Sequence, residues 1–135
     1  MSSASEAICP CGSGNRYPDC CGPIHRSGAG FGTTAEALMR SRYTAYVLEE
    51  RPFLLSSWHP DTRPPTVTFS PDQEWLGLAI VAVERGGPLD TEGSVEFIAR
   101  FRHGADYFEL HELSTFERVD GSWLYVSGSD PNSAI

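Results

Sequence analysis

The segment from Cys9 to Gly22 reads CPCGSGNRYPDCCG and contains all four cysteines of the 135-residue chain. A C-x-C pair, a loop and a C-C pair supply four soft sulfur ligands, the number and type that a structural zinc ion takes in tetrahedral coordination. Four thiolates fill every position of such an ion and leave none for a reacting water. The segment therefore predicts a structural zinc site formed by Cys9, Cys11, Cys20 and Cys21.

Disulfides and redox chemistry are the other uses that these cysteines could have. The vicinal pair can close only a strained ring, and the C-x-C pair spans too short a loop, although cross-pairing between the two pairs is sterically allowed. Residues 1–7 carry neither the basic cluster nor the apolar run of a secretory signal, so we expect a cytoplasmic protein with reduced thiols. The spacing is not the C-x-x-C of thioredoxin-like units, so iron binding or a thiol switch is a weaker alternative to zinc.

The residues between the two cysteine pairs suit a thiolate cluster. Gly12 and Gly14 allow backbone N–H groups to turn toward sulfur, and Ser13 offers a hydroxyl donor. Such donors matter because four thiolates around one divalent ion leave a net charge of about minus two. A segment this small cannot bury an apolar core of its own, so metal binding should supply its folding energy.

The pattern C-P-C-G-S-G-x-x-Y-x-x-C-C-G resembles the SEC-C motif, the zinc-binding tail first recognised on the SecA translocation ATPase. The segments 35–46 (AEALMRSRYTAY), 58–60 (WHP), 110–112 (LHE) and 120–123 (DGSW) are similar to the YchJ-like family. That family joins a SEC-C motif to a cone-shaped α+β domain of the nuclear-transport-factor-2-like superfamily. The resemblance, over about residues 8–127, implies this fold with a small N-terminal zinc knuckle.

The resemblance also implies a division of the chain and a class of partner. We expect a SEC-C motif over 1–26, a linker over 27–32, the cone domain over 33–127 and a flexible tail over 128–135. Because the SecA tail is implicated in contacts with the chaperone SecB, ribosomes and lipid, the implied partner is a protein of the translation, secretion or quality-control machinery. Only Arg16 is basic between the ligand pairs, where SEC-C motifs are commonly rich in lysine, which weakens any polybasic binding.

Charge and hydropathy exclude two classes of partner. The chain has a formal net charge of −8, and all ten of its basic residues are arginine. Nucleic acids and anionic lipid surfaces require a basic footprint, so we expect no nucleic-acid partner. The hydrophobic fraction of 40% is enough for a core, and no stretch approaches the roughly 20 apolar residues of a membrane span.

A helix over about 34–48 should follow the linker. The capping box of Thr33 and Glu36 marks its start. Its buried face, at helical spacing, should carry Ala35, Leu38, Met39, Ala45 and Tyr46 with Arg42 in the middle, and Glu36, Arg40 and Thr44 should face away. A shorter helix is expected near 52–57.

Strands should follow the helices, the order of an α+β fold. Residues 74–84 form an apolar run that predicts a strand covered on both faces, and 94–102 alternates as a half-buried strand does. A further strand is expected over 106–118, joined to a last strand over 122–127 by a hairpin turn at Asp120-Gly121.

Two charged residues fall on apolar faces of these elements, Arg42 on the helix and Glu112 on a strand. Because an unpaired buried charge costs several kcal/mol, we predict that they pair inside the cone, near Ser114, Tyr43 or His111. The pair would be a structural salt bridge, or the polar floor of a ligand pocket that Tyr46, Trp58 and Trp75 also line. His59 should lie at the pocket mouth with both tryptophans, and His111 on the opposite face of the sheet from Glu112. Four cysteines suffice for the metal, so His25 is expected beside the cluster rather than as a ligand.

Three functions are consistent with these patterns. The leading one is a non-enzymatic, zinc-containing adaptor that binds a protein partner. The alternative is a small-molecule-binding protein or a lyase or isomerase that uses the apolar cavity, with Glu112, His59 and Tyr43 as its acid and base groups. The second alternative is a homodimeric scaffold that pairs through an exposed sheet face carrying Ile98, Leu113 and His111.

Overall fold

The computed structural model describes residues 8–27, 30–31 and 33–129. The helical elements are η2 (Tyr17–Asp19), α1 (Cys21–Ser27), α2 (Ala35–Leu48) and α3 (Arg51–Ser56). The strands are β1 (Gly30–Phe31), β2 (Gln73–Arg85), β3 (Glu92–His103), β4 (Asp106–Val119) and β5 (Ser122–Ser129). None of the helices in this described part is long and apolar enough to span a bilayer.

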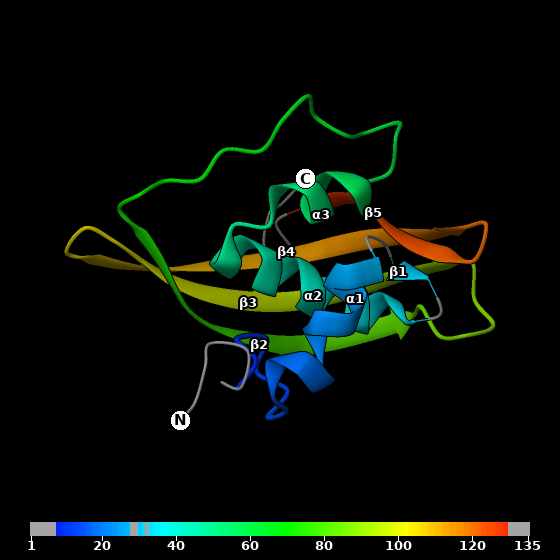
Figure 1. Cartoon of the computed structure of the whole chain (residues 1–135), viewed down its shortest axis with the longest axis horizontal. Coiled ribbons are helices and arrows are strands. Elements are labelled where there is room, and N and C mark those ends of the chain that lie inside the picture. The colour runs from blue at the N-terminus through cyan, green and yellow to red at the C-terminus, as the bar shows by residue number, and fades with distance from the viewer. Residues whose placement is uncertain (1–7, 28–29, 32, 130–135) are drawn as a thin grey trace.

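The five strands form one sheet in the order β1-β5-β4-β3-β2, with antiparallel neighbours throughout. The helices lie on one side of this curved sheet (Figure 1). Helix α2 contacts the sheet on one side and α1 on the other, so it lies between the sheet and the described part of the knuckle, residues 8–26. The α+β fold predicted from the sequence is confirmed.

Helix α2 begins one residue later than its capping signature predicts. The hydroxyl of Thr34, not Thr33, accepts a hydrogen bond from the backbone N–H of Ala37 at 3.2 Å. Ala35, Leu38, Met39 and Ala45 are buried as predicted. Thr44 was expected to face away from the core but is fully buried, because the knuckle packs on that face of the helix.

Strand β2 lies at an edge of the sheet, and the prediction that both of its faces are covered is wrong. Leu76, Val81 and Val83 are exposed by 49%, 51% and 41%. Only the inner face of an edge strand meets the helices, so an apolar run there does not require a second covering layer. The alternation of β3 is confirmed, with Val95, Phe97 and Ala99 buried.

The chain reverses between β4 and β5 at the predicted Asp120-Gly121 turn. Both residues have a positive φ, 53° and 83°, the conformation that a two-residue hairpin turn requires. Strand β5 then runs to Ser129, so the predicted tail loses its first two residues to the sheet. The predicted linker likewise contains β1, which pairs with β5. The rest of the predicted tail, residues 130–135, lies outside the described residues, as do residues 1–7.

Candidate metal centre and adjoining cavity

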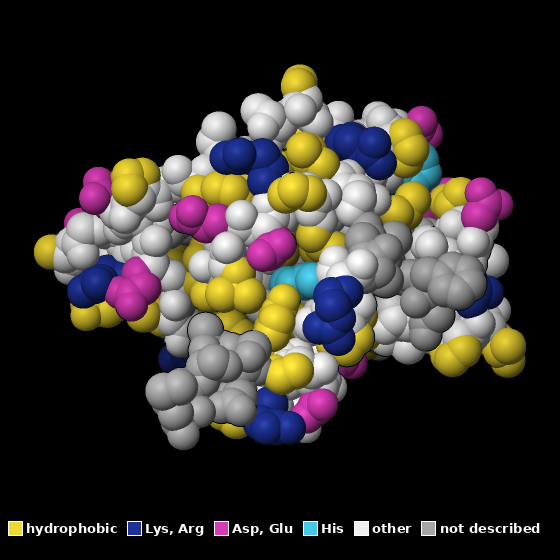
Figure 2. Space-filling model, in the orientation of Figure 1, with side chains coloured by type: hydrophobic (Ala, Val, Ile, Leu, Met, Phe, Trp, Pro, Cys, Tyr) yellow, Lys and Arg dark blue, Asp and Glu magenta, His cyan; other side chains and the backbone are white. Residues whose placement is uncertain are grey.

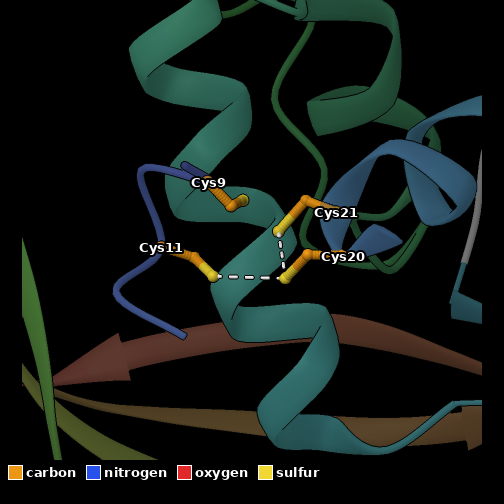
Figure 3. A group of neighbouring side chains, drawn as sticks. All are labelled: Cys9, Cys11, Cys20 and Cys21. Atoms are coloured by element: carbon orange, nitrogen blue, oxygen red, sulfur yellow. Dashed lines mark hydrogen bonds between the residues drawn. The ribbon is translucent and has the colours of Figure 1, made fainter. Parts of the chain in front are cut away.

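The four predicted ligands converge on one point at the outer side of α2 (Figure 3). Their sulfur atoms all lie within 4.8 Å of one another. The Cys11 and Cys20 sulfurs are 3.5 Å apart, and those of Cys20 and Cys21 are 3.9 Å apart. Sulfurs bound to one zinc at about 2.3 Å with tetrahedral angles would lie about 3.8 Å apart. All four cysteines are free thiols, so the set fits a single tetrahedral ion.

Short backbone elements place these sulfurs. A tight loop carries the first pair, closed by a hydrogen bond from the Cys9 N–H to the Asn15 carbonyl at 2.8 Å. Within it Gly12 and Gly14 have φ values of 83° and 87°, which glycine adopts without strain. The second pair follows the short helix η2 and leads into α1. The sequence therefore brings the two pairs together through one loop and one helix start.

Two hydroxyl groups lie next to sulfurs of the cluster. Ser13 Oγ lies 3.2 Å from the Cys20 sulfur, as the sequence predicts, and Thr44 Oγ1 of α2 lies 3.6 Å from the Cys9 sulfur. Hydrogen bonds from Cys21 and Ser13 lower the pKa of Cys11 to about 4. The same bond to Cys11, together with burial, raises the pKa of Cys21. Without a metal, the Cys11 thiol therefore loses its proton more readily than the Cys21 thiol does. A bound cation would stabilise the thiolate form of all four cysteines.

Two further polar contacts connect the knuckle to helix α2 of the cone domain. His25 lies 2.7 Å from the Ser41 carbonyl through Nε2 and 2.8 Å from the Tyr17 hydroxyl through Nδ1. Because a carbonyl can only accept, Nε2 carries the proton and Nδ1 accepts from Tyr17. The guanidinium of Arg40 donates to the Cys11 carbonyl at 2.7 Å. His25 is therefore beside the cluster, as expected, but it contacts the α2 backbone and not a sulfur.

On the other side of α2 a cavity of about 260 Å³ lies between the helix and the concave face of the sheet. Most of its wall is apolar or aromatic, and its charged groups are Arg42 and Glu112. Tyr46 and Trp75 of the predicted pocket also line it, as does Tyr43, but Trp58 does not. Instead Trp58 packs against the guanidinium of Arg42, whose central carbon lies 4.9 Å from the ring centroid.

Arg42 and Glu112 do not form the predicted ion pair: within the described residues no salt bridge joins them. Arg42 Nη1 donates to the Leu54 carbonyl at 2.9 Å and to Ser57 Oγ at 2.7 Å, both on or next to α3. Glu112 accepts from Ser114 Oγ at 2.9 Å. The Leu54 carbonyl, the Ser57 hydroxyl and the rings of Trp58 and Tyr125 therefore hold the cation in place of the carboxylate. Burial lowers the pKa of Arg42 to about 10.

Known proteins resemble this chain over most of its length. A family model for the YchJ middle NTF2-like domain matches residues 34–128. A UPF0225 protein of Streptomyces coelicolor is 47% identical over 120 residues, covering 89% of this chain and 93% of the relative. One from Bordetella parapertussis is 48% identical over 128 residues, covering 93% and 94%. The chain belongs to the YchJ-like UPF0225 family.

Two solved structures extend the likeness to the SEC-C segment. The solution structure of a SEC-C motif containing protein from Rhodopseudomonas palustris superposes with a TM-score of 0.77 at 34% identity, covering 92% of this chain and 98% of that one. The crystal structure of a SEC-C motif containing protein from Psychrobacter arcticus gives 0.74 at 28%, covering 98% and 85%. The predicted family and NTF2-like fold are confirmed.

In this UPF0225 chain the three predicted acid and base groups are not brought together. Glu112 and Tyr43 line the cavity, but His59 does not. His59 Nδ1 accepts from the backbone N–H of Asp61 at 3.1 Å, and its Nε2 lies 3.5 Å from Glu117 Oε1. The backbone of His59 donates to the β5 carbonyl of Tyr125, which fixes the residue outside the cavity.

The outer face of the sheet carries the residues of the predicted dimer surface. His111 lies there, opposite in parity to Glu112 as predicted, with Nε2 2.6 Å from Glu96 Oε2. Ile98 pairs with His111 across β3 and β4, and Leu113 pairs with Glu96. All of these side chains are half-buried, so they form a mixed polar and apolar face.

Sequence reasoning missed Gly128, which leaves room for the carboxyl group of Glu112. This glycine lies in β5 opposite Ser114, and a Cβ atom there would overlap the carboxyl group of Glu112. Glycine inside a strand marks a close approach of another group, a signal that the sequence did contain. The predicted tail began at residue 128, so this glycine was not considered as part of a strand.

Proposed function

We propose that Cys9, Cys11, Cys20 and Cys21 bind one structural zinc ion in a non-enzymatic, cytoplasmic adaptor that binds a protein partner. The supporting observation is the cluster itself: four free sulfurs within 4.8 Å of one another, three of them on buried residues. Four thiolates leave no coordination position for substrate or water, so an ion held here contributes folding energy and not catalysis.

Zinc is the metal that this donor set favours. Sulfur ligands in tetrahedral arrangement suit zinc or an iron centre, whereas oxygen ligands suit magnesium or calcium. The hydroxyls of Ser13 and Thr44 beside the sulfurs offset the negative charge of a zinc–thiolate centre. Because Thr44 belongs to α2, the ion would also hold the knuckle against the cone domain.

Metal analysis of the purified chain tests this part of the proposal. We expect one zinc per chain by elemental mass spectrometry. Replacement with cobalt should give intense thiolate-to-cobalt absorption and the visible bands of a tetrahedral site. Three results would each contradict this part of the proposal. They are iron and not zinc in the purified chain, no bound metal after preparation with zinc under reducing conditions, and no thiolate-to-cobalt absorption in the cobalt-loaded chain.

The outer side of the knuckle supplies a surface for a partner. Residues 12–16 are exposed, and Ile8, which is 62% exposed, pairs with Arg16 in an antiparallel bridge. An apolar and a cationic side chain are thus held side by side by the loop that carries the ligands. On the SEC-C resemblance, we propose that this partner belongs to the translation, secretion or quality-control machinery.

The helix side of the molecule is mixed in charge over its described part. Figure 2 shows acidic, basic and apolar side chains interspersed over the described part of the helix side. The net charge of −8 opposes binding to nucleic acid or anionic lipid, as the sequence predicts. A protein partner that recognises Ile8 and Arg16 does not require an extended basic patch.

A pair of surface variants tests the adaptor role. The full chain with metal is used as bait in a lysate, and the captured proteins are compared by quantitative mass spectrometry. Ile8→Ser combined with Arg16→Glu should lose partners that the parent chain and a Leu89→Ser control retain, because Leu89 is 95% exposed on the distant β2–β3 connection. Equal capture by both variants, at equal zinc content and thermal stability, would overturn it.

A further inference from the structure

We propose that the cavity between α2 and the sheet binds a small aromatic molecule that carries a carboxylate at one end and a hydrogen-bond donor at the other. The inference goes beyond the adaptor role and does not depend on it. It starts from the size and lining of the space. A volume of about 260 Å³ lies just below the range of pockets for drug-sized ligands, so it suits a molecule of about one ring.

The walls of the cavity select a flat apolar body. Tyr43, Tyr46 and Trp75 provide aromatic surfaces, and Phe97 and Leu110 from the sheet provide the opposite wall. The Tyr43 and Trp75 rings meet edge to face at a centroid distance of 5.7 Å, and Tyr46 lies 6.2 Å from the same indole. Aromatic rings arranged in this way favour a further ring stacked or edge-on between them.

Arg42 provides the anion-binding end. Its side chain is only 3% exposed, and Nη1 is bonded to α3 while the guanidinium carbon lies 4.4 Å from the Tyr125 ring centroid. A guanidinium has five N–H donors in one plane, and a carboxylate can take two of them in parallel. No carboxylate among the described residues lies in salt-bridge contact with Arg42, so within this part of the chain its charge has no direct counter-ion. Burial away from water lowers the pKa of Arg42, and the more distant charge of Glu112 offsets this only in part.

Glu112 provides the acceptor end. It projects from β4 into the same cavity and receives a hydrogen bond from Ser114 through Oε2. A carboxylate has about four acceptor sites, so capacity remains for a donor on a ligand. The absence of a side chain at Gly128 leaves the space that the carboxyl group occupies. Arg42 from α2 and Glu112 from β4 therefore line one cavity without forming a salt bridge. A molecule with a carboxylate at one end and a hydrogen-bond donor at the other would contact both.

A series of single-ring probes tests this against the zinc-loaded full chain. 4-Hydroxybenzoate has both ends, 4-methylbenzoate lacks the donor and 4-methylphenol lacks the acid. Binding is followed by NMR shifts of the Trp75 indole N–H and the Met39 methyl group, which line the cavity. We expect 4-hydroxybenzoate to bind about tenfold more tightly than either analogue, because each analogue loses a charge-assisted hydrogen bond.

Variants separate the two ends. Glu112→Gln keeps the size of the side chain and an acceptor oxygen but removes the charge, so it should reduce the preference for 4-hydroxybenzoate over 4-methylbenzoate several-fold. The matched outer-face control Glu96→Gln should keep the full preference. Arg42→Lys should weaken both acids while leaving 4-methylphenol unchanged. If Arg42→Lys fails to fold, the Glu112→Gln comparison alone decides the outcome. Equal affinities for all three probes, or shifts confined to other parts of the chain, would overturn the proposal.

Discussion

The sulfur of Cys9 and the hydroxyl of Thr44 are in contact, 3.6 Å apart, across the boundary between the knuckle and the cone domain. Thr44 lies on the outer side of α2, and Arg42 two residues earlier reaches the cavity on the inner side. One helix therefore has the candidate metal centre on one face and the candidate ligand site on the other.

Thr44→Val tests that contact. Valine keeps the shape of the side chain but removes the hydroxyl beside the sulfur. We expect the affinity for zinc to fall about tenfold, as on loss of an outer-shell partner, and the free energy of unfolding to fall by about 1 kcal/mol. Zinc competition with a chromophoric chelator and urea unfolding measure the two quantities. Thr66→Val, at an exposed position, is the control, and equal effects of the two substitutions would contradict the role of the contact.

Removal of the metal should loosen one region more than the rest. With a strong chelator under reducing conditions, we expect amide hydrogen exchange to rise in residues 9–26 and along α2 near Arg40 and Thr44, which contact the knuckle. The paired strands β3 and β4 should stay protected, because the knuckle does not contribute to their hydrogen bonds. Uniform loss of protection over the whole sheet would instead indicate that the metal supports the entire fold.

Gly128→Ala should destabilise the protein through a clash and not through backbone strain. The new Cβ would overlap the Glu112 carboxyl group, which is the far end of a flexible side chain and can move, so we expect a cost of about 1 kcal/mol, at the low end for overpacking. Adding Glu112→Ala removes the overlapped atoms, so the double variant should lose less stability than the two single effects sum to. Gly77→Ala is the matched strand control, since its Cβ would meet nothing within 4 Å. Strict additivity in this cycle would refute the contact.

His25 should make stability depend on pH. Burial lowers the pKa of His25 below its ordinary value of 6.5, so the unfolded chain binds this proton more readily than the folded chain does. The stabilisation is present above pH 6.5 and is lost as the pH falls from 6.5 toward the folded pKa. Protonation at Nδ1 also ends its acceptance of the Tyr17 hydroxyl proton.

The difference between the parent chain and His25→Gln isolates this effect. Urea unfolding between pH 5 and 8 should show a gap in stability that narrows on acidification, because glutamine does not titrate. Loss of metal through cysteine protonation affects both chains and cancels in the difference. A gap that is constant across this range would show that His25 does not change its protonation on unfolding.

Several features of this protein could be read directly from short stretches of sequence. The spacing of the cysteines fixed which sulfurs converge, because a loop of this length and composition brings both pairs to one point. The alternation in β3 and the Asp120-Gly121 turn were equally local. Each depends on residues that are neighbours in the chain, whose preferences act before any distant contact forms.

The tertiary structure decided what the other residues contact. Thr44 is buried because the knuckle covers a face of α2 that periodicity assigns to solvent. Arg42 does not pair with Glu112. The Leu54 carbonyl of α3, the Trp58 ring after α3 and the Tyr125 ring of β5 contact it directly instead. Such choices among partners depend on the positions of whole elements, which are set by the packing of the entire chain and not by any one segment.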